Sequence, residues 1–373
     1  MAAARGFAGK TIATIPRGPE DVTEEWLSSI LEQHGHPADI TAVEVEPIGT
    51  GQVGATFRVT PTYERRPDGL PDTFVVKLPA ADESVRNSVT FGYRSECAFY
   101  ASVNQRVLVP APDCFHVDVS ADAADFVLVL ADQVGAEQGD QLAGCGFDEA
   151  LLAVRALAGL HGPTWNDPVW RDFEGLAFNL RDEAAIRGLG DFAEMSVALA
   201  LGRIGEELSS GDHETLAAAM GSVTRWLLSE PDRRALLHGD FRLDNLLFHA
   251  DGKGVAVVDW QTLGVGLPTR DLAYFTGTSL EPDVRRAVES RLVDHYHDEL
   301  RTHGVTDYSR AQCWEDYRLG MIQALLIPCI AIATSTETDR GTAMFVAMIR
   351  RGCEAIRDLG TLALVPAPTE PEE

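Results

Sequence analysis

The stretch HGDFRLDNLLF, residues 238–248, places one histidine, two aspartates, one arginine and one asparagine directly before an apolar run. A second apolar run, VAVVDW at residues 255–260, contains a further aspartate, Asp259. The segment DGKG between the two runs is typical of a tight turn, so the whole stretch predicts a β-hairpin.

The predicted hairpin brings two oxygen-bearing side chains to one end. Asn245 begins the first strand and Asp259 ends the second, and these two ends of a hairpin lie side by side. Carboxylate and carboxamide oxygens suit Mg²⁺, which keeps several waters and also binds phosphate oxygens. Asp240 precedes the first strand by one loop, where its carboxylate can face a substrate hydroxyl.

The rest of the chain divides into a strand-rich part and a helix-rich part. Apolar periodicity predicts a helix at 19–35 and helical structure at 87–107. Alternating or continuous apolar runs predict strands at 40–49, 54–63, 72–80, 115–120 and 125–133. A glycine-rich connector at 134–146 follows, and helices dominate from residue 147 to about 360. This order favours an α+β fold over a parallel α/β sheet.

The spacing of His238, Asp240, Asn245 and Asp259 resembles the catalytic loop of the kinase-like small-molecule phosphotransferases. This family includes aminoglycoside phosphotransferases, choline kinases and ecdysteroid kinase-like proteins, and HGDFRLDN is most similar to the ecdysteroid kinase-like and general phosphotransferase members. The resemblance implies a protein-kinase-like two-lobed fold. It predicts a small antiparallel-sheet N-lobe at 1–132 and a larger helical C-lobe at 133–365. The composition of the tail at 366–373, PAPTEPEE, predicts disorder.

The resemblance also predicts a nucleotide site in the N-lobe. Gly49, Gly51 and Gly54 match the glycine-rich lid over the phosphates of ATP, although a plain hairpin turn would show the same pattern. Thr56 stands where the family usually has a valine.

Three further positions complete the predicted nucleotide site. Lys77 matches the strand lysine that holds the α- and β-phosphates, and Glu96 matches its helical carboxylate partner. The segment from Leu130 through Asp132 falls where the family's backbone binds the adenine edge. Alone, each pattern also fits an ordinary strand or helix, but together they occur in the family's order.

The family's roles for the loop residues follow from the resemblance. Asp240 would accept a hydrogen bond from the acceptor hydroxyl, and Asn245 with Asp259 would hold Mg²⁺ on the phosphates of ATP. His238 would brace the loop backbone, and Asp271 would support the loop from a neighbouring helix. Arg242 would meet either the γ-phosphate or a carboxylate of the loop.

Composition limits the partners. The chain has 31 basic and 57 acidic residues and a net charge of −26, which argues against nucleic acid and anionic membranes as main partners. The six cysteines form no C-x-x-C pair, so free thiols and a cytoplasmic location are expected. The N-terminus has no apolar segment of signal-peptide length, and the apolar run at 319–333, with Pro328 inside it, predicts a broken core helix.

The predicted function is transfer of a phosphoryl group to a hydroxyl of a small molecule, such as a hydroxylated natural product, a steroid-like alcohol or an aminoglycoside-type antibiotic. Aromatic residues of the helical part could line the acceptor pocket, but core packing explains most of them. Two alternatives stay open. A protein kinase is disfavoured because DWQ replaces the triplet DFG and no A-P-E segment follows. A silent nucleotide-binding scaffold is disfavoured because every expected polar residue is present.

Overall fold

The computed structural model describes residues 14–49, 54–177, 180 and 182–367. The chain forms two compact units, Met1–Tyr93 with Asp113–Asp132, and Arg94–Pro112 with Gln133–Glu373. Residues 94–112, placed in the N-lobe by the sequence analysis, belong to the second unit. Their backbone groups form hydrogen bonds with the rest of the second unit. The Leu108 N–H donates to the Gly159 carbonyl, and the Pro110 carbonyl accepts from the Val257 N–H.

The first unit is built on a five-stranded antiparallel sheet with the order β1-β2-β3-β5-β4. Its strands are β1 (Asp39–Pro47), β2 (Gly54–Arg65), β3 (Phe74–Pro79), β4 (Cys114–Val119) and β5 (Phe126–Ala131). All five predicted strands are confirmed. The nearly continuous apolar strand β5 lies inside the sheet between β3 and β4, as expected of a strand buried on both faces.

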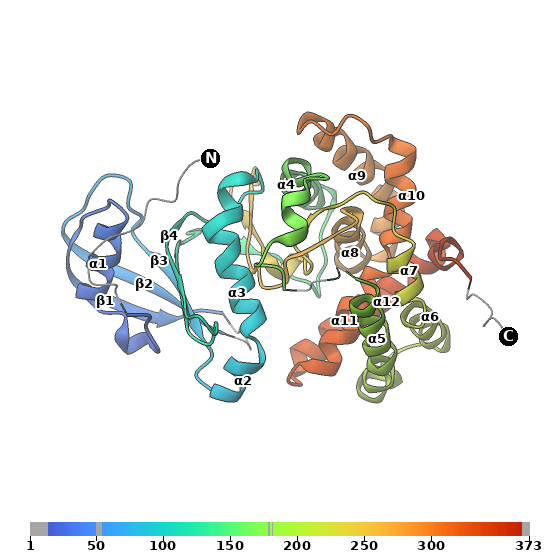
Figure 1. The fold of residues 1–373 in the computed structure, drawn as a ribbon, viewed down its shortest axis with the longest axis horizontal. Coiled ribbons are helices and arrows are strands. Elements are labelled where there is room, and N and C mark those ends of the chain that lie inside the picture. Colours follow the sequence, from blue (N-terminus) through green and yellow to red (C-terminus); the bar gives the residue numbers. More distant parts are fainter. Residues whose placement is uncertain (1–13, 50–53, 178–179, 181, 368–373) are drawn as a thin grey trace. The chain divides into compact units, whose positions relative to one another are not determined.

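Helix α1 (Glu24–Gln33) packs against this sheet (Figure 1). It begins at Thr23, whose hydroxyl accepts a hydrogen bond from the Trp26 amide at 3.2 Å. The apolar stripe predicted from the sequence is buried in one core with strand residues such as Val59 and Val76. The unit also contains the short helix α2 (Glu83–Ser88), and α3 (Thr90–Ala98) begins in it.

The second unit is mostly helical. Its remaining long helices are α4 (Phe147–Thr164), α5 (Glu183–Ile204), α6 (Ser210–Met220), α7 (Val223–Leu228), α8 (Thr269–Ser279), α9 (Pro282–Thr302), α10 (Arg310–Gly320), α11 (Gln323–Thr334) and α12 (Asp339–Leu359). Every residue of α8 is buried. Because α8 contacts α4 and each of α9 to α12, it forms the centre of this unit.

Two small sheets complete the second unit. The predicted hairpin is confirmed as β8 (Leu246–His249) and β9 (Val255–Val257), which pair antiparallel. The sequence analysis missed three strands of three residues each: β6 (Ala136–Gln138), which joins β8, and β7 (Ala235–Leu237) and β10 (Gly264–Gly266), which pair with each other. Strands this short carry no detectable periodicity.

The apolar segment near the end of the chain is interrupted at a different place than expected. The turn at Met321 and Ile322 separates α10 from α11, while α11 runs through Pro328 without ending. By length and composition the stretch Arg310–Thr334 could cross a membrane, but 61% of the 18-residue apolar window within it is buried inside the structure, as in a core helix of a globular protein. None of the six cysteines, which all lie in the described part of the chain, forms a disulfide.

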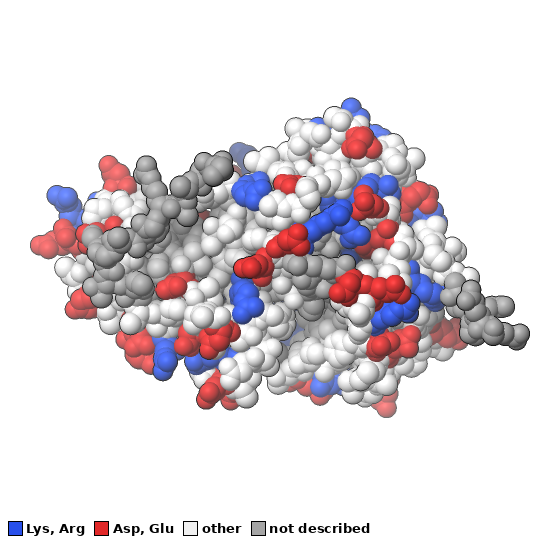
Figure 2. Space-filling view, viewed as in Figure 1, with Lys and Arg blue, Asp and Glu red and all other residues white. Residues whose placement is uncertain are grey.

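Charged side chains of the second unit are interspersed. On the face drawn in Figure 2, Lys and Arg side chains of this unit lie beside Asp and Glu side chains. Within the same unit, Arg286 forms ion pairs with Asp283, Glu354 and Asp358. Because opposite charges lie next to one another, the described side chains of this unit form no broad area of a single charge on this face, despite the excess of acidic residues.

A histidine pair in the first unit should make stability depend on pH. His116 is buried beneath α1, and its Nδ1 lies 3.0 Å from Nε2 of His34. Burial, and secondarily the neighbouring His34, lower the pKa of His116 to about 4. His116 of the unfolded chain therefore becomes protonated as the pH falls through about 6.5, whereas His116 of the folded chain becomes protonated only near pH 4.

We expect the free energy of unfolding to fall by about 3 kcal/mol as pH drops through this window, with no further loss from His116 below it. Urea unfolding of the wild type and of His116→Gln at several pH values measures this contribution. The free energy of unfolding of the variant should depend less steeply on pH between about 6.5 and 4 than that of the wild type. An identical slope in both proteins would contradict the assignment.

Candidate active site

The loop between β7 and β8 is held by one buried carboxylate. Asp271 on α8 accepts hydrogen bonds from the backbone amides of His238, at 2.6 Å, and Gly239, at 3.1 Å. Gly239 has a φ of +84°, and a Cβ there would lie 2.3 Å from the Thr262 carbonyl oxygen. Only glycine fits this close approach. The predicted bracing role of Asp271 is confirmed.

His238 is a structural member of this loop. It is fully buried, its Nε2 lies 3.1 Å from the Val258 carbonyl oxygen, and its Nδ1 accepts from the Asp240 amide at 3.3 Å. A ring bonded to the backbone on both sides holds the loop in shape and is not available as a metal ligand. This confirms the prediction that His238 braces the backbone.

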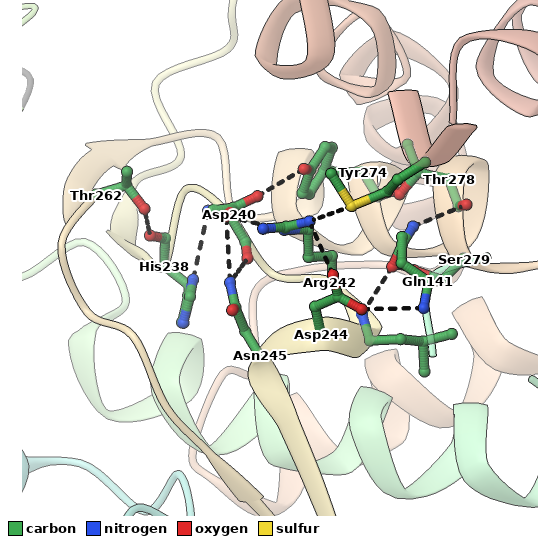
Figure 3. A network of polar contacts seen from close by, with 12 residues as sticks. Gln141, His238, Asp240, Arg242, Asp244, Asn245, Thr262, Tyr274, Thr278 and Ser279 are labelled. Atoms are coloured by element: carbon green, nitrogen blue, oxygen red, sulfur yellow. Dashed lines mark hydrogen bonds and ion pairs between the residues drawn. The ribbon is translucent and has the colours of Figure 1, made fainter. Parts of the chain in front are cut away.

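The Asp240 carboxylate is partly exposed and well oriented (Figure 3). Its Oδ1 accepts from the Tyr274 hydroxyl at 2.6 Å. Its Oδ2 accepts from Nε of Arg242 at 3.0 Å and from Nδ2 of Asn245 at 3.2 Å. With 21% of the side chain exposed, the carboxylate is oriented by several donors and still reachable from solvent.

The hairpin brings Asn245 and Asp259 together as expected. Leu246 is opposite Val257 in the β8–β9 ladder, and the Val258 amide donates to the Asn245 carbonyl at 3.0 Å. Asn245 and Asp259 therefore flank the same end of the hairpin. Nδ2 of Asn245 donates to Asp240, to its carbonyl as well as its carboxylate, so the amide oxygen Oδ1 is directed away from that residue.

Asp259 differs from the other acidic residues of this loop region. Its φ of +67° is left-handed, a conformation that is uncommon outside glycine and that concentrates at functional sites. Among the described residues, its carboxylate has neither a hydrogen-bond nor an ion-pair partner. A half-buried carboxylate without a partner, beside a carboxamide oxygen, offers the hard oxygen donors that a small divalent cation requires.

Trp260, the residue after Asp259, anchors this end of the hairpin. Its ring stacks on Phe99 with centroids 3.6 Å apart, and its carbonyl accepts from the Ser95 hydroxyl at 2.9 Å. The next residue, Gln261, lies within 3.5 Å of Glu96 on α3. The buried Glu96 is thus close in space to the segment that follows Asp259.

A chain of alternating charges extends from Asp240. Arg242 lies between Asp240 and Asp244, and both carboxylates together raise its pKa although burial alone would lower it. Arg340, at the start of α12, binds both oxygens of Asp244 at 3.0 and 3.1 Å. Burial would raise the pKa of Asp244, but the hydrogen bonds from Arg340 and the charge of Arg242 outweigh it and lower that pKa. Of the two roles predicted for Arg242, this geometry supports the contact with loop carboxylates.

Three residues of this network were not predicted. Gln141 is fully buried; its side-chain oxygen accepts from the Leu243 backbone N–H, and its backbone N–H donates to the Asp244 carboxylate. Arg340 and Asp244 are 96 residues apart, and nothing in the sequence links them. Tyr274 is one of the aromatic residues of the helical part, for which the sequence suggested core packing or an acceptor pocket and no contact with the loop. Its position three residues after Asp271 on one helix, which places both on the same face, was the available signal.

The first unit carries the other predicted residues. Gly49 has a φ of +76°, as the predicted turn requires, and Gly51 lies outside the described residues. Gly54 begins β2, where a Cβ would approach the Leu78 carbonyl oxygen to 3.2 Å. Lys77 lies on β3 between Thr56 and Leu128 of the neighbouring strands. Lys77 belongs to the first unit and Glu96 to the second, so their pairing stays a prediction.

The segment predicted to bind adenine, Leu130 to Asp132, lies at the end of strand β5 in the sheet of the first unit. Leu130 is buried in β5. The Asp132 carboxylate accepts from Nε of Arg58 at 2.6 Å and from the Thr73 hydroxyl at 2.8 Å. Its side chain is thereby engaged within the sheet, so any contact of Asp132 with a nucleotide would have to come from the backbone.

A sequence model described as "Phosphotransferase enzyme family" matches residues 44–314. The chain belongs to this phosphotransferase family. The match includes the catalytic loop, the hairpin and α8, together with the strands that carry Gly54 and Lys77. It confirms the predicted relationship and the α+β kinase-like fold class.

Individual relatives agree over shorter stretches. The human "Acyl-CoA dehydrogenase family member 11" is 43% identical over 63 residues, which are 16% of this chain and 8% of that protein. The mouse "Acyl-CoA dehydrogenase family member 10" is 47% identical over 60 residues, which are 15% of this chain and 6% of that protein. The matched stretch of this phosphotransferase is therefore less than a tenth of the length of these curated relatives.

The solved structures that match this chain include one named as a phosphotransferase and one named as a kinase. A putative aminoglycoside phosphotransferase from Ralstonia eutropha JMP134 has a TM-score of 0.48 and 16% identity, with 89% of this chain and 97% of that chain covered. An ethanolamine kinase from Plasmodium vivax has a TM-score of 0.49 and 11% identity, with 83% of this chain and 82% of that chain covered.

The bracing by Asp271 predicts a large loss of stability when it is removed. Asp271→Ala leaves two buried backbone amides without an acceptor, so the free energy of unfolding should fall by roughly 2–5 kcal/mol. Urea unfolding measures this loss. Asp283→Ala, an exposed aspartate on α9 of the same unit, is the control and should change stability little. Equal effects of the two variants would rule out the bracing role.

Proposed function

We propose that this chain is an ATP- and Mg²⁺-dependent phosphotransferase that transfers the γ-phosphoryl group to a hydroxyl of a small molecule. The observation that carries the proposal is the arrangement at the hairpin. The solvent-reachable carboxylate of Asp240 accepts a hydrogen bond from Asn245, and Asn245 lies at the same hairpin end as Asp259, whose carboxylate has no partner among the described residues. Membership of the phosphotransferase family supports it.

The residues at the hairpin end fit a magnesium ion. Among the described residues, no group of three or more His, Cys, Asp or Glu side chains could hold a metal. A cation here would therefore rest on Asn245, Asp259, water and phosphate oxygens, which is the mixed oxygen set that Mg²⁺ accepts. When bound, Mg²⁺ would supply positive charge to the phosphates of ATP. Asn245 and Asp259 are the residues that would hold it.

The proposed mechanism depends mainly on positioning. Asp240 orients the acceptor hydroxyl and takes its proton late, because a loose transition state needs little activation of the nucleophile. Lys77, steadied by Glu96, binds the α- and β-phosphates in this proposal. Gly49, Gly51 and Gly54 cover the phosphates, and backbone groups from Leu130 to Asp132 bind the adenine.

The acceptor class is less constrained than the transfer step. Hydroxylated natural products, steroid-like alcohols and aminoglycosides remain the proposed acceptors from the family resemblance. The relatives named as acyl-CoA dehydrogenase family members add one class to test, a hydroxylated acyl thioester. Fold membership alone does not select among these classes.

An acceptor screen tests the proposal directly. The purified full chain is incubated with Mg-ATP and, separately, with each acceptor class, a protein mixture or no acceptor, and ADP and phosphorylated products are quantified. Product formation on a small hydroxylated compound supports the proposal. Phosphorylation of protein alone would favour a protein kinase, and Mg-ATP binding without turnover would favour a silent scaffold.

Replacing the proposed proton acceptor should abolish most turnover without preventing nucleotide binding. Asp240→Asn keeps the size of the side chain but cannot take up the proton, so kcat should fall about 100-fold or more. The Mg-ATP thermal shift should stay unchanged. Asp251→Asn, in the turn of the same hairpin, is the matched control and should retain full turnover. Full turnover of Asp240→Asn would refute the assigned role.

Removing the second proposed metal ligand should affect binding instead. Asp259→Ala removes a carboxylate that has no partner among the described residues, so its fold should be retained while Mg²⁺-dependent ATP affinity falls about 10-fold or more. Calorimetric titration with ATP, with and without Mg²⁺, separates the two contributions, and Asp251→Ala is the control. A normal Mg-ATP titration by Asp259→Ala would count against the metal site.

A further inference from the structure

The hydroxyl of Tyr274 makes the shortest of the three side-chain hydrogen bonds to the Asp240 carboxylate described here, at 2.6 Å. Tyr274 lies on α8 and is 1% exposed, and its ring packs with Met344 and Met348 in one apolar cluster. A phenol enclosed in this way has few alternative positions. Its hydroxyl is therefore a rigid donor aimed at one oxygen of the carboxylate (Figure 3).

The two oxygens of the Asp240 carboxylate are unequally occupied. Oδ2 accepts from Arg242 and from Asn245, whereas Oδ1 accepts from Tyr274 alone among the described residues. A carboxylate oxygen offers about two acceptor directions. Oδ2 is thus filled, and Oδ1 keeps one direction for an incoming hydroxyl.

We propose that Tyr274 is a positioning residue for phosphoryl transfer, which holds Asp240 so that the unoccupied direction of Oδ1 faces the acceptor hydroxyl. This inference rests on the proposed function. In the reaction, the acceptor oxygen forms a bond to the γ-phosphorus. The bond from that phosphorus to the bridging oxygen breaks with its electron pair going to ADP, and the hydroxyl proton passes to Oδ1.

Tyr274 stays a donor throughout this step. Burial, and secondarily the charge of Asp240, raise the pKa of the Tyr274 phenol well above its ordinary value. The phenol therefore keeps its proton and does not compete for the one that the acceptor releases. Since Asp271 and Tyr274 lie on the same helix, α8 holds both the backbone of the catalytic loop and the carboxylate that projects from it.

The test compares two buried tyrosines that each donate to a carboxylate. Tyr274→Phe removes the hydroxyl and keeps the ring, and Tyr317→Phe removes a hydroxyl that donates to Glu289 at 3.0 Å in the same unit. Turnover of Mg-ATP with water as the acceptor is measured, together with the KM for ATP and the thermal midpoint. Tyr274→Phe should lower kcat about 10- to 100-fold at unchanged KM, and Tyr317→Phe should leave kcat within about twofold.

A double-variant cycle with Asp240→Asn distinguishes positioning from a general structural effect. The amide of Asp240→Asn cannot take up the proton, so its orientation no longer matters and adding Tyr274→Phe should lower kcat no further. An unchanged kcat for Tyr274→Phe, or an equal fold loss in both backgrounds, overturns the inference while the proposed function stands. Undetectable turnover by the wild type with water and with every acceptor class of the screen, or full turnover by Asp240→Asn, overturns the proposed function and the inference with it.

Discussion

The catalytic loop depends on the pair of backbone hydrogen bonds that Asp271 accepts. A loop of this shape turns two amides, those of His238 and Gly239, toward the protein interior, and buried amides need an acceptor. Asp271 supplies both oxygens from α8, a helix with no exposed residue. The position of Asp240 is therefore set by the most deeply packed helix of the second unit. This explains how a short loop can hold a reactive carboxylate in one orientation.

The electrostatics around the loop follow from the need to place several carboxylates near one another. Asp240 and Asp244 would repel each other without the guanidinium of Arg242 between them. Asp244 in turn pairs with the guanidinium of Arg340 from α12 and accepts a hydrogen bond from the backbone N–H of Gln141. Alternating charges thus stabilise a local concentration of acid in a chain of net charge −26. The excess of acidic residues is tolerated here because each buried carboxylate of this network has a basic or amide partner.

The parts of the fold that the sequence predicts are those in which neighbours in space are neighbours in sequence. The β8–β9 hairpin places Asn245 beside Asp259 through a local turn, and the apolar stripe of α1 needs only its own periodicity. The strands β7 and β10 escaped prediction because three residues carry no pattern and their pairing spans the whole loop region. Arg340 and Gln141 reach Asp244 from 96 and 103 residues away, and only the packing of the whole unit brings them there. Sequence motifs therefore identify the groups proposed to react, while the residues that orient them come from tertiary structure.

The carboxylates of Asp240 and Asp259 differ in how many hydrogen bonds they accept, which matches the different roles proposed for them. A proton acceptor must present one oxygen at a defined angle, and Asp240 has three side-chain donors that set this angle. A metal ligand is instead oriented by the cation it binds, so prior partners would have to be displaced and would cost affinity. Asp259 has no such partner among the described residues, and its left-handed backbone is sustained by the stacking of Trp260 next to it. Donor occupancy and backbone strain therefore separate the two roles, although both residues are aspartates on the same supersecondary unit.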